Sequence, residues 1–183
     1  MPIQIDNSWS LFLDRDGVLN KEKNNDYIYN WSEFVFYDGV KEGMQIFNSH
    51  FTKIIIVTNQ RGVGKKLMNQ EDLDNIHKNL KIHIEENSGR IDAIFSCTDL
   101  SNDSINRKPN IGMALQAKKQ FPSIDFSKSI MVGNKLSDME FGRNAGMTTI
   151  FLATTHPQTA FPHEFVDYRF NDLLSFAKAL KNS

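Results

Sequence analysis

The N-terminal part of the chain contains the stretch Ser10-Leu-Phe-Leu-Asp-Arg-Asp-Gly-Val-Leu-Asn20. Its first residues form an apolar run without polar alternation, which is typical of a strand in a parallel sheet covered on both faces. The run ends at Asp14, and Asp16 and Gly17 follow directly. Open α/β sheets bind their ligands at the carboxyl ends of their strands. The two carboxylates are therefore either ordinary turn residues or part of a functional site.

The bulk composition limits the possible classes of protein. The chain has 183 residues, 40% of them hydrophobic, and a formal net charge of −1. This length predicts one domain, residues 1–183, with a substantial core. A charge near zero argues against broad electrostatic binding to nucleic acid or anionic membranes. Neither a secretory signal nor an apolar stretch of the roughly 20 residues that a spanning helix needs is visible. We expect a cytoplasmic monomer that binds neither nucleic acid nor membranes.

Apolar runs and amphipathic segments alternate along the rest of the chain. We expect strands at 9–13, 53–57, 92–97, 129–133, 148–152 and 168–170, and helices starting near 38 and spanning about 70–87, 111–120 and 172–181, with a short one ending near 146. We expect residues 18–37, a polar and aromatic-rich segment, to form a long loop or a small hairpin, and residues 61–64 to form a flexible loop. Alternating strands and helices indicate an α/β fold, a Rossmann-like three-layer sandwich with a mostly parallel sheet.

Three of the predicted buried strands end in polar side chains. These are Asp14 and Asp16, then Thr58 and Asn59, then Asn134 and Asp138, and Lys108 lies in a loop before a helix. Right-handed crossovers place all these strand ends at one edge of the sheet. Such a set suits phosphoryl transfer, in which one carboxylate attacks phosphorus and the other protonates the leaving oxygen and then activates water. A lysine and a Mg²⁺ ion with oxygen ligands offset the negative charge.

Four ordered motifs resemble those of the haloacid dehalogenase (HAD) superfamily. They are Asp14-x-Asp16-Gly17, Thr58-Asn59, Lys108-Pro109 and Gly133-Asn134-x-x-x-Asp138. The longer segments Val57-Thr-Asn-Gln-Arg-Gly-Val-Gly64 and Val132-Gly-Asn-Lys-Leu-Ser-Asp-Met139 are similar to the D-glycero-D-manno-heptose-1,7-bisphosphate phosphatases and the related histidinol-phosphate phosphatases. The resemblance spans nearly the whole chain and implies a HAD-type fold.

The resemblance also implies a role for each matching residue. Asp14 is the expected nucleophile, Asp16 the general acid/base, and Lys108 the residue that stabilises the phosphoryl group. The expected phosphate- and substrate-binding residues are Thr58, Asn59, Gln60, Arg61 and Arg107. The expected Mg²⁺ ligands are Asp14, Asp16, Asn134 and Asp138. The short gaps between the motifs leave no room for a large cap domain, so we expect substrate specificity to come from loops 20–36, 61–69 and 98–107.

Two departures from the family pattern bear on activity. Asn134 stands where the family usually has an Asp that binds Mg²⁺, so the site loses one negative charge and we expect weaker Mg²⁺ binding. The bisphosphatases often have a Cys/His zinc loop before Arg-Lys-Pro, but here the region from Cys97 to Arg107 offers one thiol and no His. Because a structural zinc needs about four N or S ligands, no zinc is expected.

The sequence therefore predicts a Mg²⁺-dependent phosphatase that acts on a small phosphate ester, with heptose 1,7-bisphosphate as the best specific choice. Histidinol phosphate or another small phosphomonoester is the alternative within this class. Polynucleotide 3′-phosphatases share these motifs, but this chain has no strongly basic composition of the kind that nucleic-acid binding requires, which argues against that activity. An alternative from a different functional class is a phosphate-binding or regulatory protein that has lost catalysis because Asn134 replaces the usual Asp.

Overall fold

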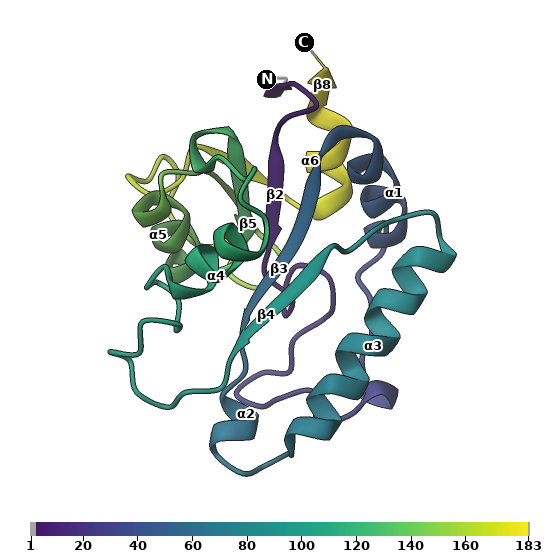
Figure 1. The fold of residues 1–183 in the computed structure, drawn as a ribbon, viewed down its shortest axis with the longest axis vertical. Coiled ribbons are helices and arrows are strands. Elements are labelled where there is room, and N and C mark those ends of the chain that lie inside the picture. Colours follow the sequence, from purple (N-terminus) through teal and green to yellow (C-terminus); the bar gives the residue numbers. More distant parts are fainter. Residues whose placement is uncertain (1–2, 183) are drawn as a thin grey trace.

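A six-stranded parallel sheet forms the centre of the computed structural model, which describes residues 3–182 (Figure 1). Its spatial order is β4 (Ala93–Cys97), β3 (Lys53–Asn59), β2 (Ser10–Leu13), β5 (Ser129–Gly133), β6 (Thr148–Leu152) and β7 (Tyr168–Phe170). From β2 the sheet grows first to one side, through β3 and β4, and then to the other side, through β5, β6 and β7. The strand β2 therefore lies between β3 and β5. This arrangement confirms the α/β, Rossmann-like prediction and creates a switch point beside the first strand, where such sheets bind ligands.

Alternate side chains of the central strands enter two separate cores. Leu11 and Leu13 of β2 pack into the first core, while Phe12 between them packs into the second. The same alternation occurs in β3, where Ile54 and Ile55 point to opposite faces. Because successive side chains of a strand point to opposite faces, a continuous apolar run is what a sheet covered on both sides requires.

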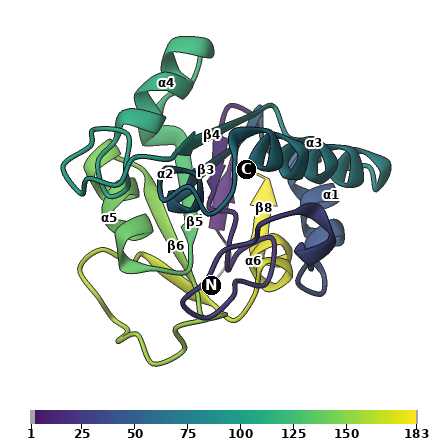
Figure 2. The ribbon, with the colours of Figure 1, turned by 90° about the horizontal axis from the view of Figure 1, so that it is seen from below.

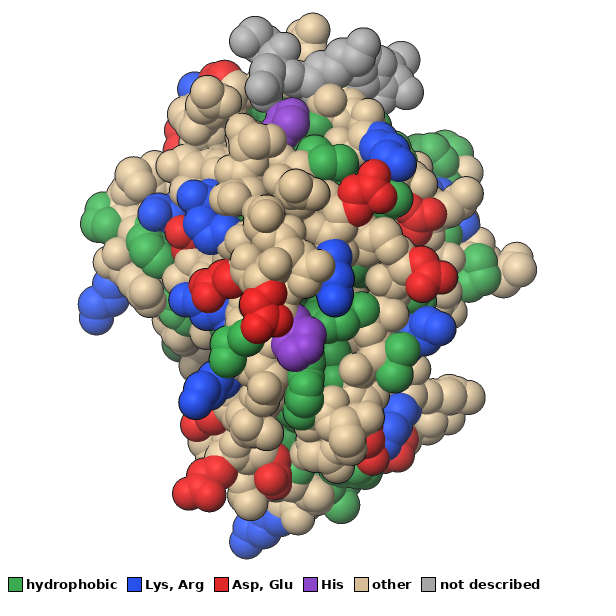
Figure 3. All heavy atoms as spheres, turned by 90° about the vertical axis from the view of Figure 1, so that its right-hand side faces the viewer, with side chains coloured by type: hydrophobic (Ala, Val, Ile, Leu, Met, Phe, Trp, Pro, Cys, Tyr) green, Lys and Arg blue, Asp and Glu red, His purple; other side chains and the backbone are tan. Residues whose placement is uncertain are grey.

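Helices cover both faces of the sheet and complete the three layers. The first core is closed by α1 (Val40–His50), α3 (Gln70–Glu86) and α6 (Leu173–Ala179), and the second by α4 (Gly112–Gln120) and α5 (Leu136–Ala145). Figure 2 shows the two groups of helices on opposite sides of the strands. The outer surface over α1 and α3 carries acidic and basic side chains interspersed with one another (Figure 3).

Local sequence signals explain where several helices begin and end. Asn69 caps α3, because its side chain accepts a hydrogen bond from the Asp72 N–H at 2.8 Å and the Asp72 carboxylate accepts one from the Asn69 N–H at 2.9 Å. This reciprocal pair is a capping box. Gly146 ends α5 in the left-handed region, with φ of 83°, a conformation that favours glycine.

The loop that leaves β2 on the site side contains little regular structure. Between β2 and α1, its only helical turn is η1 (Trp31–Glu33). A second 3-10 turn, η2 (Phe126–Lys128), directly precedes β5. No cap domain interrupts the fold anywhere in residues 3–182, as expected. Within that range, no helix is both long and apolar enough to cross a membrane.

Two local expectations were wrong. Residues 61–64, expected as a flexible loop, form the short helix α2 (Arg61–Gly64). The last helix ends at Ala179 rather than near 181, because Leu180–Asn182 (β8) pairs in parallel with Ile3–Ile5 (β1). This two-stranded pairing joins the two ends of the described chain, and a sequence pattern three residues long does not reveal such a partner.

We predict that Phe47→Ala destabilises the fold by about 3–5 kcal/mol, because it removes a fully buried ring and leaves a cavity. Phe47 packs against Phe51 and Phe176, so it joins α1 to α6. Urea unfolding measures the change. Leu115→Ala is the control, because Leu115 is exposed on α4, and it should change stability by less than about 0.5 kcal/mol. Similar values for the two variants would contradict the assignment of the first core.

Candidate active site

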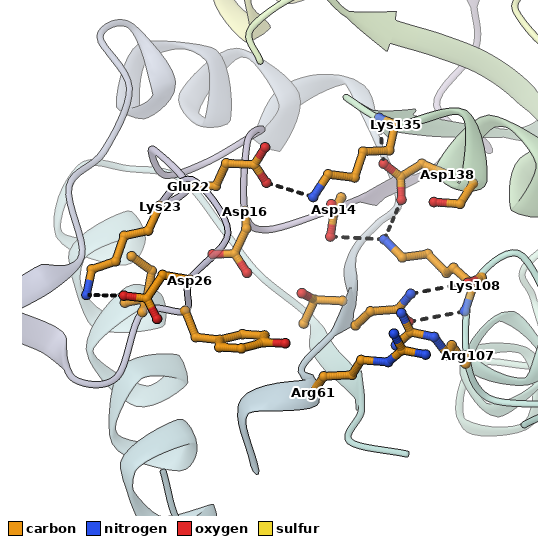
Figure 4. A pocket seen from close by; sticks show the side chains of 15 residues that line it. Asp14, Asp16, Glu22, Lys23, Asp26, Arg61, Arg107, Lys108, Lys135 and Asp138 are labelled. Atoms are coloured by element: carbon orange, nitrogen blue, oxygen red, sulfur yellow. Dashed lines mark hydrogen bonds and ion pairs between the residues drawn. The ribbon is translucent and has the colours of Figure 1, made fainter. Parts of the chain in front are cut away.

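A cavity of about 260 Å³ opens at the carboxyl ends of β2 and β3 and the loops that follow them. Its wall contains Asp14 and Asp16 after β2, Thr58 and Asn59 from β3, and Lys108 from the loop before α4. The cavity thus brings together residues that lie far apart in the sequence. Figure 4 shows Asp14, Lys108 and Asp138 side by side in this wall.

Lys108 lies between two carboxylates in the buried part of the wall. Its Nζ is 2.9 Å from Asp14 Oδ1 and 2.7 Å from Asp138 Oδ1, and all three side chains are less than 10% exposed. Burial alone lowers the pKa of Lys108, but the charges of Asp138 and Asp14 outweigh it and raise this pKa above its ordinary value. The lysine is therefore a permanent cation beside Asp14.

Asp14 has one occupied and one available oxygen. Its Oδ1 forms an ion pair with Lys108 Nζ and accepts a hydrogen bond from the Arg15 N–H at 2.8 Å. Within residues 3–182, no donor is bonded to Oδ2. Burial raises the pKa of Asp14 to about 6, with Lys108 opposing the rise and Asp138 and Asp16 adding to it. An ionised, poorly solvated carboxylate with a free oxygen is a competent nucleophile.

Asp16 lies in a contrasting environment of several donors. It accepts hydrogen bonds from the Arg15 guanidinium, from Asn20 Nδ2 at 2.8 Å and from Gln60 Nε2 at 2.8 Å. Burial alone raises the pKa of Asp16, but the Arg15 charge and these hydrogen bonds outweigh it, so the pKa is lowered. The pKa values of these two neighbouring carboxylates are therefore shifted in opposite directions by their surroundings.

Arg15 and His77 were missed as parts of the site. Arg15 is completely buried, and its Nη1 lies 3.2 Å from His77 Nε2 on α3. No sequence spacing links position 77 to position 15, so this contact has no local signal in the sequence. Burial and then the nearby Arg15 charge lower the pKa of His77 to about 3, so the ring is neutral.

The strand-end residues of β3 have roles more varied than expected. The Asn59 side chain holds the Lys108 backbone in place, through Nδ2 to the Lys108 carbonyl at 3.2 Å and through Oδ1 from the Lys108 N–H at 3.1 Å. Thr58 lines the cavity as expected. Gln60, expected to bind phosphate, is 2% exposed and donates instead to Asp16 and Thr58. Its side chain lies behind the wall because its amide nitrogen bonds to these two residues and its amide oxygen accepts from Arg15 Nη2.

Two arginines form the cationic side of the cavity. Arg61 and Arg107 both line it, and burial together with the charge of Arg61 lowers the pKa of Arg107. The Arg61 Nη2 is already engaged, since it donates to the Leu100 carbonyl at 2.8 Å and to Asn102 Oδ1 at 2.5 Å. Arg107 Nη1 is buried and makes no hydrogen bond within the described residues. Arg107 is thus the freer of the two cations.

The opposite side of the cavity carries charged side chains of both signs and was not predicted. Glu22, Asp26 and Tyr27 from the loop after β2 line it. Glu22 pairs with Lys135 at 2.7 Å across the cavity, and Lys23 approaches Asp26 at 3.8 Å (Figure 4). Sequence placed these residues in a long polar loop, but only the folded loop shows which of them face Asp14.

The remaining expected metal ligands differ in their availability. Asp138 is fully engaged, because Oδ1 contacts Lys108 and Oδ2 accepts from the Asn134 and Lys135 N–H groups at 3.2 and 3.1 Å. Asn134 donates through Nδ2 to Thr155 Oγ1 at 2.5 Å, and its Oδ1 is buried with no hydrogen-bond donor in the described chain. The amide lies against Gly17, where a Cβ would be 2.0 Å from Asn134 Nδ2.

These oxygens fit a Mg²⁺ ion held by few protein groups. Mg²⁺ is often bound through one or two carboxylates together with substrate phosphate and water, and Asp14 and the Asn134 Oδ1 supply oxygens of this kind. The residues described in the structure contain no group of three or more His, Cys, Asp or Glu side chains arranged to hold a metal. The ligand roles expected for Asp16 and Asp138 stay predictions.

Comparison with known proteins reveals clear relatives. The family described as "Polynucleotide kinase 3 phosphatase" matches residues 10–171. The D-glycero-alpha-D-manno-heptose-1,7-bisphosphate 7-phosphatase of Mycobacterium bovis is 32% identical over 173 residues, covering 94% of this chain and 91% of that protein. The enzyme of the same name from Campylobacter jejuni is 33% identical over 170 residues, covering 92% and 95%.

A solved structure shares the fold. The D,D-heptose 1,7-bisphosphate phosphatase of B. bronchiseptica, complexed with magnesium and phosphate, superposes with a TM-score of 0.83 at 23% identity, covering 93% of this chain and 96% of the other. At this identity the likeness shows the fold alone. It confirms the HAD-type architecture expected from the four motifs.

The raised pKa of Asp14 predicts a pH-dependent stability difference. The folded protein retains the Asp14 proton up to about pH 6, whereas an unfolded Asp releases it near its ordinary pKa of about 3.9. Ionising Asp14 therefore destabilises the metal-free fold as pH rises through this window. Relative to Asp14→Asn, the wild type should lose about 2–3 kcal/mol between about pH 4 and about pH 6.

Urea unfolding in the presence of a chelator measures this difference at several pH values. Asp103→Asn, which removes an exposed carboxylate, is the control. A wild-type stability that does not fall relative to Asp14→Asn as pH rises would contradict the raised pKa.

We predict that Asn134→Asp tightens Mg²⁺ binding by roughly tenfold, because one added negative charge near the ion gains Coulomb energy that exceeds its desolvation cost. Isothermal titration calorimetry measures the affinity. Asn75→Asp adds the same charge on the exposed face of α3 and should leave the affinity unchanged. Equal effects of both substitutions would show that Asn134 does not lie at the cation site.

Proposed function

Because the chain belongs to the HAD-type phosphatase family that includes the heptose-1,7-bisphosphate 7-phosphatases, we propose that it hydrolyses the 7-phosphate of a D-glycero-D-manno-heptose 1,7-bisphosphate. The observation that carries the proposal is that one cavity contains a reacting site and a separate cation. Asp14 and Lys108 form the reacting site, and Arg107, whose Nη1 makes no hydrogen bond within the described residues, lines the same cavity. A substrate with two phosphates would place one at each.

The first half of the reaction transfers the phosphoryl group to the protein. The free Oδ2 of Asp14 attacks phosphorus and forms an aspartyl-phosphate, while the bond from phosphorus to the sugar oxygen breaks. Asp16 gives a proton to that departing oxygen. Lys108, fixed by Asp138 and by the Asn59 hydrogen bonds, keeps its positive charge beside the reacting group throughout.

The second half releases phosphate and restores the protein. Asp16 takes a proton from water, and the resulting hydroxide attacks phosphorus, so that inorganic phosphate leaves and Asp14 is regenerated. Asp14 and Asn134 would hold a Mg²⁺ ion, whose positive charge would offset that of the phosphate oxygens. With one carboxylate and one neutral amide as ligands, this chain should need more Mg²⁺ than a site with two carboxylates.

The side of the cavity opposite the arginines bears on the choice of substrate. Glu22 and Asp26 face the cavity there, and their carboxylates, paired with Lys135 and Lys23, are suited to accept hydrogen bonds from sugar hydroxyls. This supports a small polyhydroxylated substrate over a polynucleotide end, the activity for which the matching family is named. The relatives above 30% identity are named for the alpha anomer of the heptose, which favours that anomer here.

Hydrolysis of a panel of phosphate esters tests the proposal. The panel contains both anomers of the heptose bisphosphate, a heptose monophosphate, histidinol phosphate and a 3′-phosphorylated oligonucleotide, each with and without Mg²⁺. We expect Mg²⁺-dependent release of one phosphate from the bisphosphate, with the highest kcat/KM of the panel, and none with Asp14→Asn. Absence of turnover at any Mg²⁺ concentration would instead favour a phosphate-binding protein without catalysis. Monomeric state and cytoplasmic location stay predictions.

We predict that Arg107→Ala raises KM for the bisphosphate by about ten- to hundredfold, because a charge-assisted hydrogen bond contributes about 1.5–3 kcal/mol, and leaves KM for a monophosphate nearly unchanged. Steady-state kinetics on both esters measures the contrast. Arg143→Ala serves as the control, because Arg143 lies on α5, pairs with Asp167 and does not line the cavity. An equal loss on both esters would show that Arg107 does not contact the second phosphate.

A further inference from the structure

Arg15 holds Asp16 in place with several donor atoms. Its Nε lies 3.2 Å from Asp16 Oδ1, and its Nη2 lies 3.0 Å from both Asp16 oxygens. A guanidinium is planar and its N–H groups form a rigid fork, so the orientation of this plane determines where the Asp16 carboxylate lies. Arg15 is fully buried, whereas the Asp16 side chain is 23% exposed toward the cavity.

The plane of Arg15 is itself fixed by two groups behind the cavity wall. Gln60 Oε1 accepts from Nη2 at 3.2 Å, and His77 Nε2 lies 3.2 Å from Nη1. An arginine is only a donor, so His77 must accept through an unprotonated Nε2 and carry its proton on Nδ1. The ring of Phe34 lies 6.0 Å from the guanidinium carbon. These contacts leave Arg15 one orientation.

We infer that His77 is a positioning residue for the reaction, acting through Arg15 to place the Asp16 carboxylate against the leaving oxygen. The inference rests on the proposed function for the chemistry that Asp16 performs. His77 does not touch the cavity, so it is not a catalytic residue. Loss of its acceptor frees the Nη1 end of the guanidinium in a buried site, and a displacement of the acid by about 1 Å is sufficient to reduce proton transfer by up to about a hundredfold.

Substrates with different leaving groups distinguish a positioning role of His77 from a general structural role. An alkyl phosphate, such as a sugar phosphate, needs a proton on its leaving oxygen, whereas a nitrophenyl phosphate leaves as a stable phenolate. In single-turnover experiments, His77→Leu should lower the rate of Asp14 phosphorylation about tenfold or more with the sugar phosphate and much less with the nitrophenyl ester. KM and the binding of inorganic phosphate should stay at wild-type values.

Two further variants sharpen the test. His77→Gln retains an acceptor near the position of Nε2 and should restore most of the rate with the sugar phosphate. His83→Leu removes a histidine of the same helix that packs on Trp31 and Phe36, and should leave the ratio of the two rates unchanged. An equal loss on both esters in His77→Leu, or no loss on either, would overturn the inference.

NMR makes the inference testable even if the wild type hydrolyses none of the esters, an outcome that would reject the proposed function. The His77 ring should show the Nδ1–H tautomer at neutral pH. The Arg15 Nε–H signal should shift in His77→Leu and stay in place in His83→Leu. A doubly protonated ring, an Nε2–H tautomer, or an Arg15 signal indifferent to His77 would overturn the inference on its own.

Discussion

The buried contact between Lys108 and the carboxylates of Asp14 and Asp138 is the interaction on which the rest of the site depends. A charge buried without a partner is costly, and two acidic groups this close repel one another. Lys108 resolves both problems because its Nζ lies within 3 Å of each carboxylate. The residues around it then have evident purposes, since Asn59 fixes its backbone and Asp138 joins it to the start of α5.

The same principle separates the two carboxylates that follow β2. Asp14 has a buried position, one lysine and two acidic neighbours, and its pKa rises. Asp16, two residues later, receives an arginine and two side-chain amides, and its pKa falls. Two identical side chains thus have different proton affinities because different parts of the fold supply their neighbours. Arg15 connects the second environment to α3, so a helix that covers the sheet also contributes to the order of the site.

The charged groups of the cavity come from different parts of the fold. Arg61 and Arg107 lie in elements after β3 and β4 and have no carboxylate partner within residues 3–182, whereas Glu22 and Asp26 lie in the loop after β2 and are paired with Lys135 and Lys23. The two arginines are therefore the groups suited to a phosphate, and the paired carboxylates are suited to hydroxyl groups. Arg61 has a second task, since it ties the 98–107 loop to α2 through Leu100 and Asn102.

The sequence by itself determined the fold class and the residues that line the reacting end of the cavity. Uninterrupted apolar runs identified the buried strands, and the common edge of a parallel sheet brought Asp14, Thr58 and Lys108 together, because right-handed crossovers allow no other placement. The four motifs also identified the family that the comparisons confirm.

Only the tertiary structure decided what surrounds those residues. It placed His77 behind Arg15, turned Gln60 away from the cavity and aimed Glu22 and Asp26 into it. Contacts of this kind join positions that are tens of residues apart and that show no periodicity. They depend on side-chain packing and on the path of an irregular loop, and neither of these is encoded in a local pattern of hydrophobicity or charge.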